Sequence, residues 1–148
     1  MNQLKAIFIV LLGTLLLAAC TPGAVNATKP AGPSLPATAV TGTVTYRQRI
    51  ALPPDAVVNV TIEDVSRADA PADMIGQQII ETRGSQVPIP FAVPYDSNKI
   101  EENHSYNLRA TIKDGSGKLL FTSDTAVPVI TRGNPTKDVE IMVIPAGS

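Results

Sequence analysis

The sequence predicts a single antiparallel β-sandwich over residues 40–145, and three observations support this fold class. Apolar and polar residues alternate with a period of two in most stretches of this region, which is typical of half-buried strands. Pro, Gly, Asp and Asn residues interrupt the alternation at intervals of about 8–15 residues, and no stretch has the 3.6-residue apolar period of an amphipathic helix. About seven strands in about 105 residues fit one sandwich domain.

The first three strands are expected at residues 40–46, 57–65 and 74–82. In the first strand, Gly42, Val44 and Tyr46 share one face and threonines occupy the other. Paired prolines before the second strand predict a turn, because proline cannot donate a hydrogen bond to a strand ladder. The third strand has a weaker pattern, since Gly76 and two glutamines interrupt its apolar residues.

Prolines mark the fourth strand, at residues 87–93, as an edge strand. Its apolar residues alternate with positions of which three are proline, namely Pro88, Pro90 and Pro94. A proline within a sheet is tolerated at an edge, where its missing N–H also discourages another chain from pairing. The polar segment that follows, residues 95–103, has room for one helical turn.

The last strands are expected at residues 106–112, 119–127 and 139–144. Residues 114–117, Asp-Gly-Ser-Gly, predict a hairpin turn because Asp and Gly tolerate positive φ. The register of the returning strand stays open, since either Leu119 and Phe121 or Leu120 and Thr122 can begin its inward face. The final strand has apolar residues on both faces, which predicts a central position in a sheet.

The N-terminus has the pattern of a lipoprotein signal peptide over residues 1–19, with a positive start, an apolar stretch and small residues before the cut. Leu17, Ala18 and Ala19 form a lipobox with Cys20, the only cysteine, and predict signal-peptidase cleavage before an acylated Cys20. The apolar run is shorter than the about 20 residues of a spanning helix. An uncleaved membrane anchor is the alternative. We expect a covalent lipid on Cys20 and no cofactor.

Residues 20–39 are rich in Pro, Ala, Gly and Thr and have no hydrophobic period, which predicts a flexible tether. A flexible chain of this length reaches roughly 25 Å, enough to hold the domain away from a bilayer. The alternative is a short first strand built from its Ala and Val residues. Thr21 follows the cysteine where aspartate would retain a lipoprotein in the inner membrane. We therefore expect a protein anchored in the outer membrane by two or three acyl chains and facing the periplasm.

The composition disfavours several function classes. Removal of Lys5 with the signal leaves 11 basic residues against 13 acidic ones, a charge too small to attract nucleic acid. Aromatic rings are few and tryptophan is absent, which argues against a carbohydrate or single-strand nucleic-acid platform. A single cysteine offers no pair for a disulfide, so the stability of the domain must come from packing.

Few side chains suggest catalysis or metal binding. His104 is the only histidine, and no Gly-x-Ser-x-Gly motif accompanies it, so we expect a solvated loop histidine and neither a catalytic triad nor a zinc site. The acidic pairs at residues 63–64 and 101–102 raise general acid–base catalysis or calcium binding as alternatives. Neighbouring strand residues face opposite sides, however, and calcium needs six or more oxygens. We expect a protein that is not an enzyme.

Four charged loop residues are candidates for an ion-pair network that fixes the loop connections: Arg67, Asp69, Asp124 and Arg132. A structural role is favoured over a ligand site for this set. Exposed ion pairs contribute only about 0–1 kcal/mol each, so the network would define geometry more than stability.

Four blocks of this sequence resemble the YbaY-like lipoproteins, which are grouped with the type III secretion pilotin lipoprotein YscW. The blocks are VTGTVTYRQRIALPPDAVV, EDVSRADAPA, VPIPFAVPYD and LLFTSDTAVPVITRGNP, and the resemblance covers about residues 40–145. It implies a small β-sandwich lipoprotein. Pilotins of this group bind a secretin subunit and escort it to the outer membrane.

From the anchor, the tether and this resemblance we expect a pilotin-like, membrane-tethered binding and chaperone module for a secretin-type envelope protein. Strand addition at an open sheet edge is one mode of binding that fits. The alternative function is that of a structural or stress-related envelope lipoprotein, or of an inhibitor of a lytic enzyme, without an escort role.

Overall fold

The computed structural model describes residues 38–147. The signal peptide with Leu17, Ala18 and Ala19, the lipid-attachment residue Cys20 and most of the expected tether lie outside the described residues, so the predictions made for them stay predictions. The strands run from Ala39 to Pro145. Within residues 38–147, no helix has the length and apolar character needed to span a bilayer.

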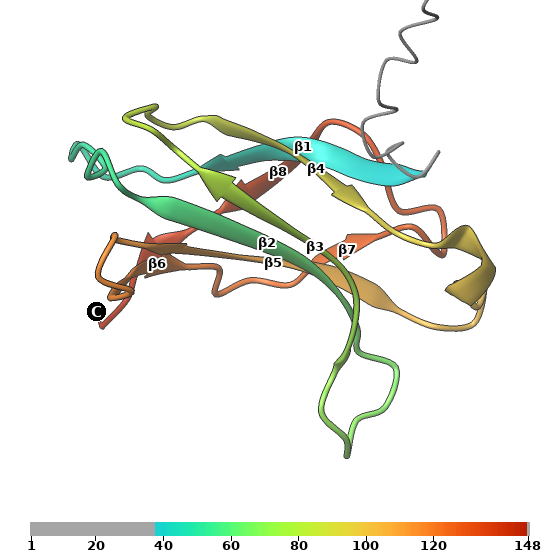
Figure 1. Ribbon diagram of the computed structural model, residues 1–148. Helices are drawn as coiled ribbons and strands as arrows, with labels where there is room; N and C mark the ends of the chain where they lie inside the picture. Colours follow the sequence, from blue (N-terminus) through green and yellow to red (C-terminus); the bar gives the residue numbers. More distant parts are fainter. Residues whose placement is uncertain (1–37, 148) are drawn as a thin grey trace, which may run out of the picture. The chain divides into compact units, whose positions relative to one another are not determined.

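Two β-sheets enclose the core (Figure 1), and the predicted all-β sandwich is confirmed. The smaller sheet has three strands in the order β4 (Ile89–Pro94), β1 (Ala39–Thr45) and β8 (Val139–Met142). The larger sheet has six: β3 (Asp73–Glu81), β2 (Val57–Asp64), β5 (Tyr106–Lys113), β6 (Leu119–Thr122) and β9 (Ile144–Pro145) in that order, with β7 (Val127–Val129) also paired to β5.

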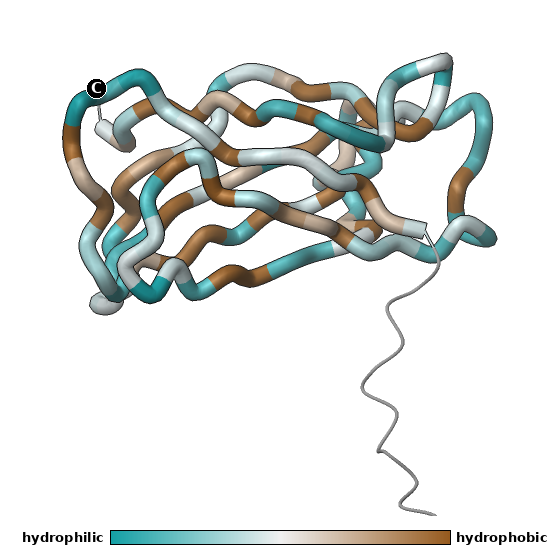
Figure 2. Tube along the Cα trace, turned by 90° about the horizontal axis from the view of Figure 1, so that it is seen from above, coloured by the Kyte–Doolittle hydropathy of each residue, from teal (hydrophilic) through white to brown (hydrophobic). Residues whose placement is uncertain are grey.

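The inward faces of the two sheets form one core, because alternate residues of a strand point to the same side. Figure 2 shows this alternation of hydrophobic and hydrophilic residues along the strands. In β1, Val40 and Val44 are fully buried. Gly42 lies between them and leaves room for the backbone of Val139, whose carbonyl a Cβ at position 42 would overlap. The buried residues of β5 are Tyr106, Leu108, Ala110 and Ile112.

Two local predictions are confirmed. β4 is an edge strand of the three-stranded sheet, as its prolines indicated, and pairs there with β1. The loop after β4 contains one short 3₁₀ turn, η1 (Ser97–Lys99), where the sequence left room for a helical turn. Asp96 caps this turn, because its side chain accepts a hydrogen bond from the Asn98 N–H at 3.0 Å.

The prediction of a central last strand is wrong. β8 lies at an edge of the three-stranded sheet and pairs with β1 in parallel, the one parallel pair among the described strands. The segment then crosses to the six-stranded sheet, where β9 pairs with β6. Val143 lies at the crossing, is buried, and donates its N–H to the Thr45 carbonyl at 2.9 Å. The apolar residues on both faces therefore reflect a chain that passes from one sheet to the other around the core.

The strand expected at residues 119–127 is interrupted. Its first part, β6, has Phe121 buried and Leu119 exposed, with an irregular register where β5 reaches Lys113. Residues 123–126 separate β6 from β7. Ser123 still contacts β5, because its N–H donates to the Ala110 carbonyl at 2.9 Å and its hydroxyl accepts a hydrogen bond from the Ala110 N–H at 3.1 Å.

The strand registers define two ends of the domain. At the first, which we call the proximal end, the chain enters at Thr38, and the loops after β2, β4 and β7 lie there because Ala39 pairs with Pro94 and Asp64 with Tyr106. At the opposite, distal end lie the loops after β1, β3 and β5, as well as the C-terminal segment (Figure 1).

Candidate binding surfaces

The free edge of β4 is closed to an additional strand. In an antiparallel strand, the N–H and C=O groups of alternate residues point to the same side. The Ala92 N–H points away from β1, because it donates to the Gln78 side chain of β3 at 2.6 Å. Pro90 and Pro94 share this orientation, and proline has no N–H. Of the outward-facing residues of this strand, two therefore have no donor and the third is already hydrogen-bonded.

The neighbouring edge of β3 is covered by β4. A Cβ at Gly76 would overlap the Pro94 carbonyl, so the two backbones meet closely there. Val143 donates to β1, so by alternation Glu140 and Met142 are the residues of β8 that direct their backbone groups away from β1. An edge of two residues gives little room for strand addition.

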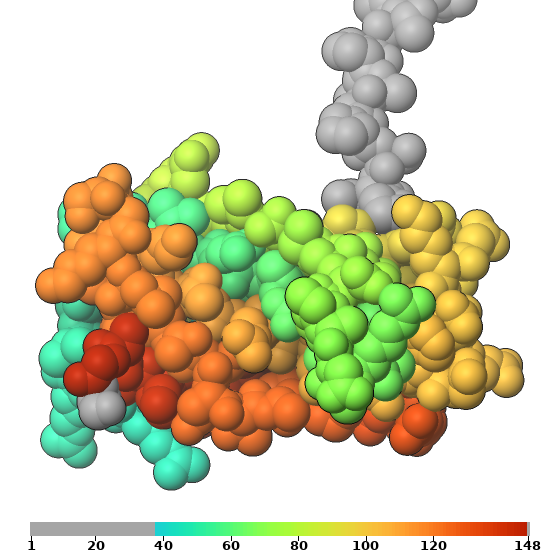
Figure 3. Space-filling view, turned by 90° about the horizontal axis from the view of Figure 1, so that it is seen from below, coloured from blue at the N-terminus to red at the C-terminus, as the bar shows by residue number. Residues whose placement is uncertain are grey.

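An arm formed by the ends of β2 and β3 and their connection, residues 63–75, projects from the outer face of the six-stranded sheet (Figure 1; green in Figure 3). Hydrogen bonds fix its base. The Asp64 carboxylate accepts hydrogen bonds from the Ser66 N–H at 2.9 Å and from the Ser66 hydroxyl at 2.6 Å. Ser105 is bonded in both directions, since its N–H donates to the Ser66 hydroxyl and its carbonyl accepts from the Val65 N–H.

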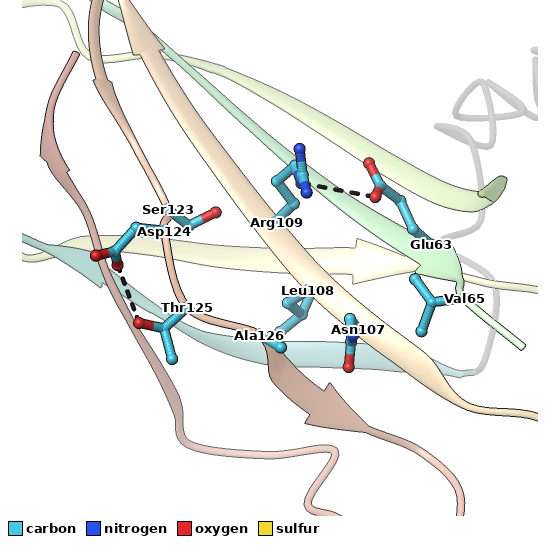
Figure 4. A pocket seen from close by; sticks show the side chains of 9 residues that line it. All are labelled: Glu63, Val65, Asn107, Leu108, Arg109, Ser123, Asp124, Thr125 and Ala126. Atoms are coloured by element: carbon cyan, nitrogen blue, oxygen red, sulfur yellow. Dashed lines mark hydrogen bonds and ion pairs between the residues drawn. The ribbon is translucent and has the colours of Figure 1, made fainter. Parts of the chain in front are cut away.

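A hollow of about 210 Å³ lies on one side of the arm (Figure 4). It opens where residues 123–126 interrupt the strand, and Val65 of the arm forms its opposite wall. Arg109 and Glu63 form an ion pair at its floor, with 3.6 Å between Nε and Oε2. The hollow thus combines an apolar wall with a charged floor.

A second hollow, of about 180 Å³, lies on the other side of the arm and contains His104. The Nδ1 of His104 is 2.6 Å from Oδ2 of Asp64, and its Nε2 is 3.3 Å from Oε2 of Glu101. His104 lies in the loop before β5, as expected, but it is less solvated than expected, because its side chain is only 24% exposed and contacts a carboxylate on each side. The other residues around this hollow are Arg67, Pro71, Asp73, Ile75 and Lys99.

The carboxyl group of Asp64, which lines the second hollow, has a lowered pKa. Its burial would raise the pKa of the carboxyl group, but hydrogen bonds from Ser66 and His104 outweigh this effect and hold the pKa below its usual value. The loop that carries His104 is also held by the segment after β7, since the Thr131 hydroxyl donates to the His104 carbonyl at 2.7 Å. The arm and the loop after β4 therefore form one fixed structure.

The structure does not join the four residues of the expected ion-pair network. None of the ion pairs within residues 38–147 connects two of them. Arg67 lines the His104 hollow, Asp69 is exposed in the turn of the arm, and Asp124 accepts a hydrogen bond from the neighbouring Thr125 at 3.0 Å. Arg132 donates to the Asn103 carbonyl at 3.0 Å. The loops are tied by side-chain to backbone hydrogen bonds, which a search for opposite charges does not reveal.

Large exposed hydrophobic side chains concentrate on the six-stranded sheet and its arm: Met74 (59% exposed), Ile79 (64%), Leu119 (39%) and Val65 (36%). Val65 and Met74 both belong to the arm. The fifth such residue, Ile50 (58%), lies at the distal end. In the part of the chain that the structure describes, no group of three or more His, Cys, Asp or Glu side chains is arranged to hold a metal ion.

Comparison with known proteins identifies the family. Residues 35–141 match the family described as type III secretion system lipoprotein chaperone (YscW). The chain belongs to this family. It is also 39% identical over 105 residues to the uncharacterized lipoprotein YbaY of Escherichia coli (strain K12), in a match that covers 71% of the chain and 55% of YbaY. The chain thus spans about half the length of this curated relative.

A solved structure is similar throughout the domain. It is that of an alternative pilotin from the type II secretion system of Vibrio cholerae, with 48% sequence identity and a TM-score of 0.71. The match covers 75% of this chain and 98% of the pilotin. The predicted resemblance to YbaY-like and YscW lipoproteins is confirmed. The chain therefore shares its fold with this alternative pilotin.

The arm and its two hollows were not predicted from the sequence. The stretch Asp64-Val65-Ser66 contains a signal that was available, because Asp followed two residues later by Ser is typical of a side-chain-capped turn. The exposed Met74 was assigned to a strand, but its outward orientation depends on a bulge in the pairing between β2 and β3.

Proposed function

We propose that this YscW-family protein is anchored to the outer membrane by acyl chains on Cys20, faces the periplasm, and binds and escorts a secretin-type envelope protein. It would do so without a catalytic centre and without a cofactor other than the covalent lipid. The lipobox and Thr21 support the anchor, and the similarity to an alternative pilotin supports the escort role.

The observation that supports this binding site is the contrast between the closed side of β3 and β4 and the exposed apolar side chains of the arm. Val65 and Met74 present 36% and 59% of their surface to solvent on a segment whose base is fixed by Asp64, Ser66 and Ser105. A segment whose base is already held by hydrogen bonds loses less entropy on binding, which favours affinity. We assign the arm and its two hollows as the partner-binding surface. The partner would contact the side chains of this surface and would not add a strand to a sheet.

Site-directed crosslinking in intact cells that make the secretin tests this function. The lipidated protein with Val65→Asp and Met74→Asp should recover at least about tenfold less secretin than the unaltered protein, because two charges would have to be desolvated in the interface. Ile79→Asp is the matched control, since Ile79 is also an exposed apolar residue of β3 but lies beyond the arm. It should recover secretin normally.

Two further results would decide against the proposal. Equal recovery from the arm variant and the unaltered protein would show that the arm is not the binding surface. A deletion strain with normal secretin assembly but altered sensitivity to detergent or lysozyme would favour a structural or inhibitory lipoprotein. Mass spectrometry of the native protein tests the anchor separately, and a free thiol on Cys20 would contradict it.

A further inference from the structure

The distal end carries an excess of exposed basic side chains. Its exposed basic residues are Arg47, Arg49, Arg83, Lys113 and Lys118, whereas its acidic residues are Asp55, Glu81 and Asp114. The proximal end has the opposite balance. Acidic residues there are Asp64, Asp69, Asp73, Asp96, Glu101, Glu102 and Asp138, against Arg67, Lys99, Arg132 and Lys137. The domain is therefore polarised along its length.

Several of the distal cations have no carboxylate partner. Among the described residues, Arg47, Arg49 and Lys113 form no ion pair within 4.0 Å. Two of the acidic groups are already engaged. Glu81 pairs with Arg83 at 3.3 Å, and the carboxylate of Asp114 accepts three hydrogen bonds within its own turn. The excess of positive charge at this end is thus available to a ligand.

The loop that carries Arg47 and Arg49 is held firmly. Tyr46 stacks on Phe121 with 4.4 Å between ring centroids and 6° between the planes, and its hydroxyl donates to the Ile50 carbonyl at 2.7 Å. Further along, the buried Leu52 donates its N–H to the Gln86 side chain at 2.7 Å. Ile50 is nevertheless 58% exposed, directly after the two arginines.

An exposed isoleucine beside two unpaired guanidinium groups, on a loop fixed from both sides, is a preorganised recognition surface. Arginine pairs with carboxylates through two parallel hydrogen bonds and is enriched at interfaces, where it often supplies a large share of the binding energy. The apolar side chain between such contacts excludes water from them. Anionic lipid headgroups would also suit the arginines, so the position of this end decides between the two ligands.

The chain enters the domain at Thr38, at the end opposite to Arg47 and Arg49. If Cys20 carries the anchor, as the proposed function states, the tether to it joins the domain at the proximal end. The basic surface lies at the other end of the domain from the point where the tether joins. This favours a protein ligand over the headgroups of the anchoring bilayer.

We infer that the distal end is a second docking surface, for an acidic segment of the partner protein. Arg47 and Arg49 pair with carboxylates of that segment, and Ile50 contacts an apolar side chain between them. The inference rests on the proposed function, since it concerns the same partner, but it uses a surface separate from the arm. A partner engaged at both ends gains affinity because the second contact is intramolecular.

The experiment places a photo-crosslinking residue at position 50 of the full-length, lipidated protein in intact cells, and at position 74 of the arm in a parallel strain. Crosslinked peptides are identified by mass spectrometry. We expect the position-50 product to map to a partner segment with clear excess of Asp and Glu. With Arg47→Glu and Arg49→Glu its yield should fall by about tenfold or more, because attraction becomes repulsion.

The control reverses charge at the proximal end with Lys137→Glu, an exposed residue that lines neither hollow, and should leave the position-50 yield unchanged. Circular dichroism checks that each variant is folded. Crosslinking at position 74 but not at position 50, or a position-50 product with a basic segment or a lipid, overturns the inference and leaves the proposed function intact. A position-50 yield insensitive to the two arginine reversals also overturns it. Loss of partner crosslinks at both positions contradicts the proposed function as well.

Discussion

The two outer surfaces next to β3 differ in what they offer a partner. Where β3 faces β4, two prolines, the Gln78 side chain and the close approach at Gly76 leave no free donor on the outward side of β4. Where β3 leads into the arm, apolar side chains are exposed, and the backbone at the base of the arm is held by a hydrogen bond from the Ser66 N–H to the Asp64 carboxylate. The first surface thus offers a partner no free backbone donor of β4, whereas the second offers exposed side chains. This combination prevents uncontrolled strand pairing while keeping a specific surface open.

The largest effect on stability is expected from a substitution that pushes β4 away from β3. Gly76→Val should lower the free energy of unfolding by about 2–4 kcal/mol, because its Cβ would overlap the Pro94 carbonyl and push β4 away from β3. Urea unfolding followed by circular dichroism measures the change. Gly84→Asn is the control, since nothing lies within 4 Å of that position and asparagine tolerates its φ of 85°. Equal stability of the two variants would show that β3 and β4 are not in close contact.

A smaller effect is expected from the hydrogen bond across the same side. Gln78→Ala should destabilise the domain by about 1–2 kcal/mol, because the outward Ala92 N–H loses its acceptor. Gln77→Ala removes an exposed hydrogen bond to Asn59 and serves as the matched control. Its effect should stay below about 0.5 kcal/mol.

At the base of the arm, Asp64 makes a contribution to the stability of the fold that depends on pH. Because the folded-state pKa of Asp64 lies below its usual value, the stabilisation is present above the usual aspartate range and is lost as the pH falls through the folded pKa. Asp64→Asn should cost about 1 kcal/mol at neutral pH through lost charge-assisted hydrogen bonds. It should also flatten the loss of stability in acid. Urea unfolding at a series of pH values measures both effects.

Asp69→Asn is the control for this pH experiment, because Asp69 lies exposed in the same arm. It should keep the acid dependence of the unaltered protein. Asp114, whose pKa is also lowered, chiefly by a hydrogen bond from the Ser116 hydroxyl, continues to contribute in all three proteins. If Asp64→Asn and the unaltered protein lose stability in parallel, the contacts of Asp64 with Ser66 and His104 do not stabilise the folded state.

What the sequence could predict is the part determined by neighbouring residues. The alternation in residues 106–112 and the prolines around Phe91 are local patterns, so the faces of β5 and the edge position of β4 followed from them. The parallel pairing of β8 with β1 joins segments about a hundred residues apart, and nothing local distinguishes it from an antiparallel pair. Apolar residues on both faces of 139–144 were compatible with either a central strand or a crossing one.

The candidate surface was harder to predict for the same reason. The hollow beside Val65 exists because residues 123–126 lie between β6 and β7 and interrupt the strand. The position of His104 depends on its contact with Asp64, forty residues earlier. A solvated histidine and an ion-pair network were expected because charge patterns were considered without the backbone carbonyls that hold the loops. The resemblance to pilotins indicated the kind of function, whereas the site required the three-dimensional arrangement.

The smallest effect on stability is expected from the ion pair on the open side. Arg109→Gln should change the free energy of unfolding by less than about 0.5 kcal/mol, because the arginine side chain is 62% exposed and its contact with Glu63 is long, at 3.6 Å. The same variant should reduce secretin crosslinking at the arm by a fewfold, since Arg109 forms the floor of the hollow. Thr111→Val, on the next half-buried position of β5, is the control for the strand itself. If Arg109→Gln instead costs more than about 1 kcal/mol and leaves crosslinking unchanged, the pair serves to hold β2 against β5, and the hollow belongs to the fold and not to binding.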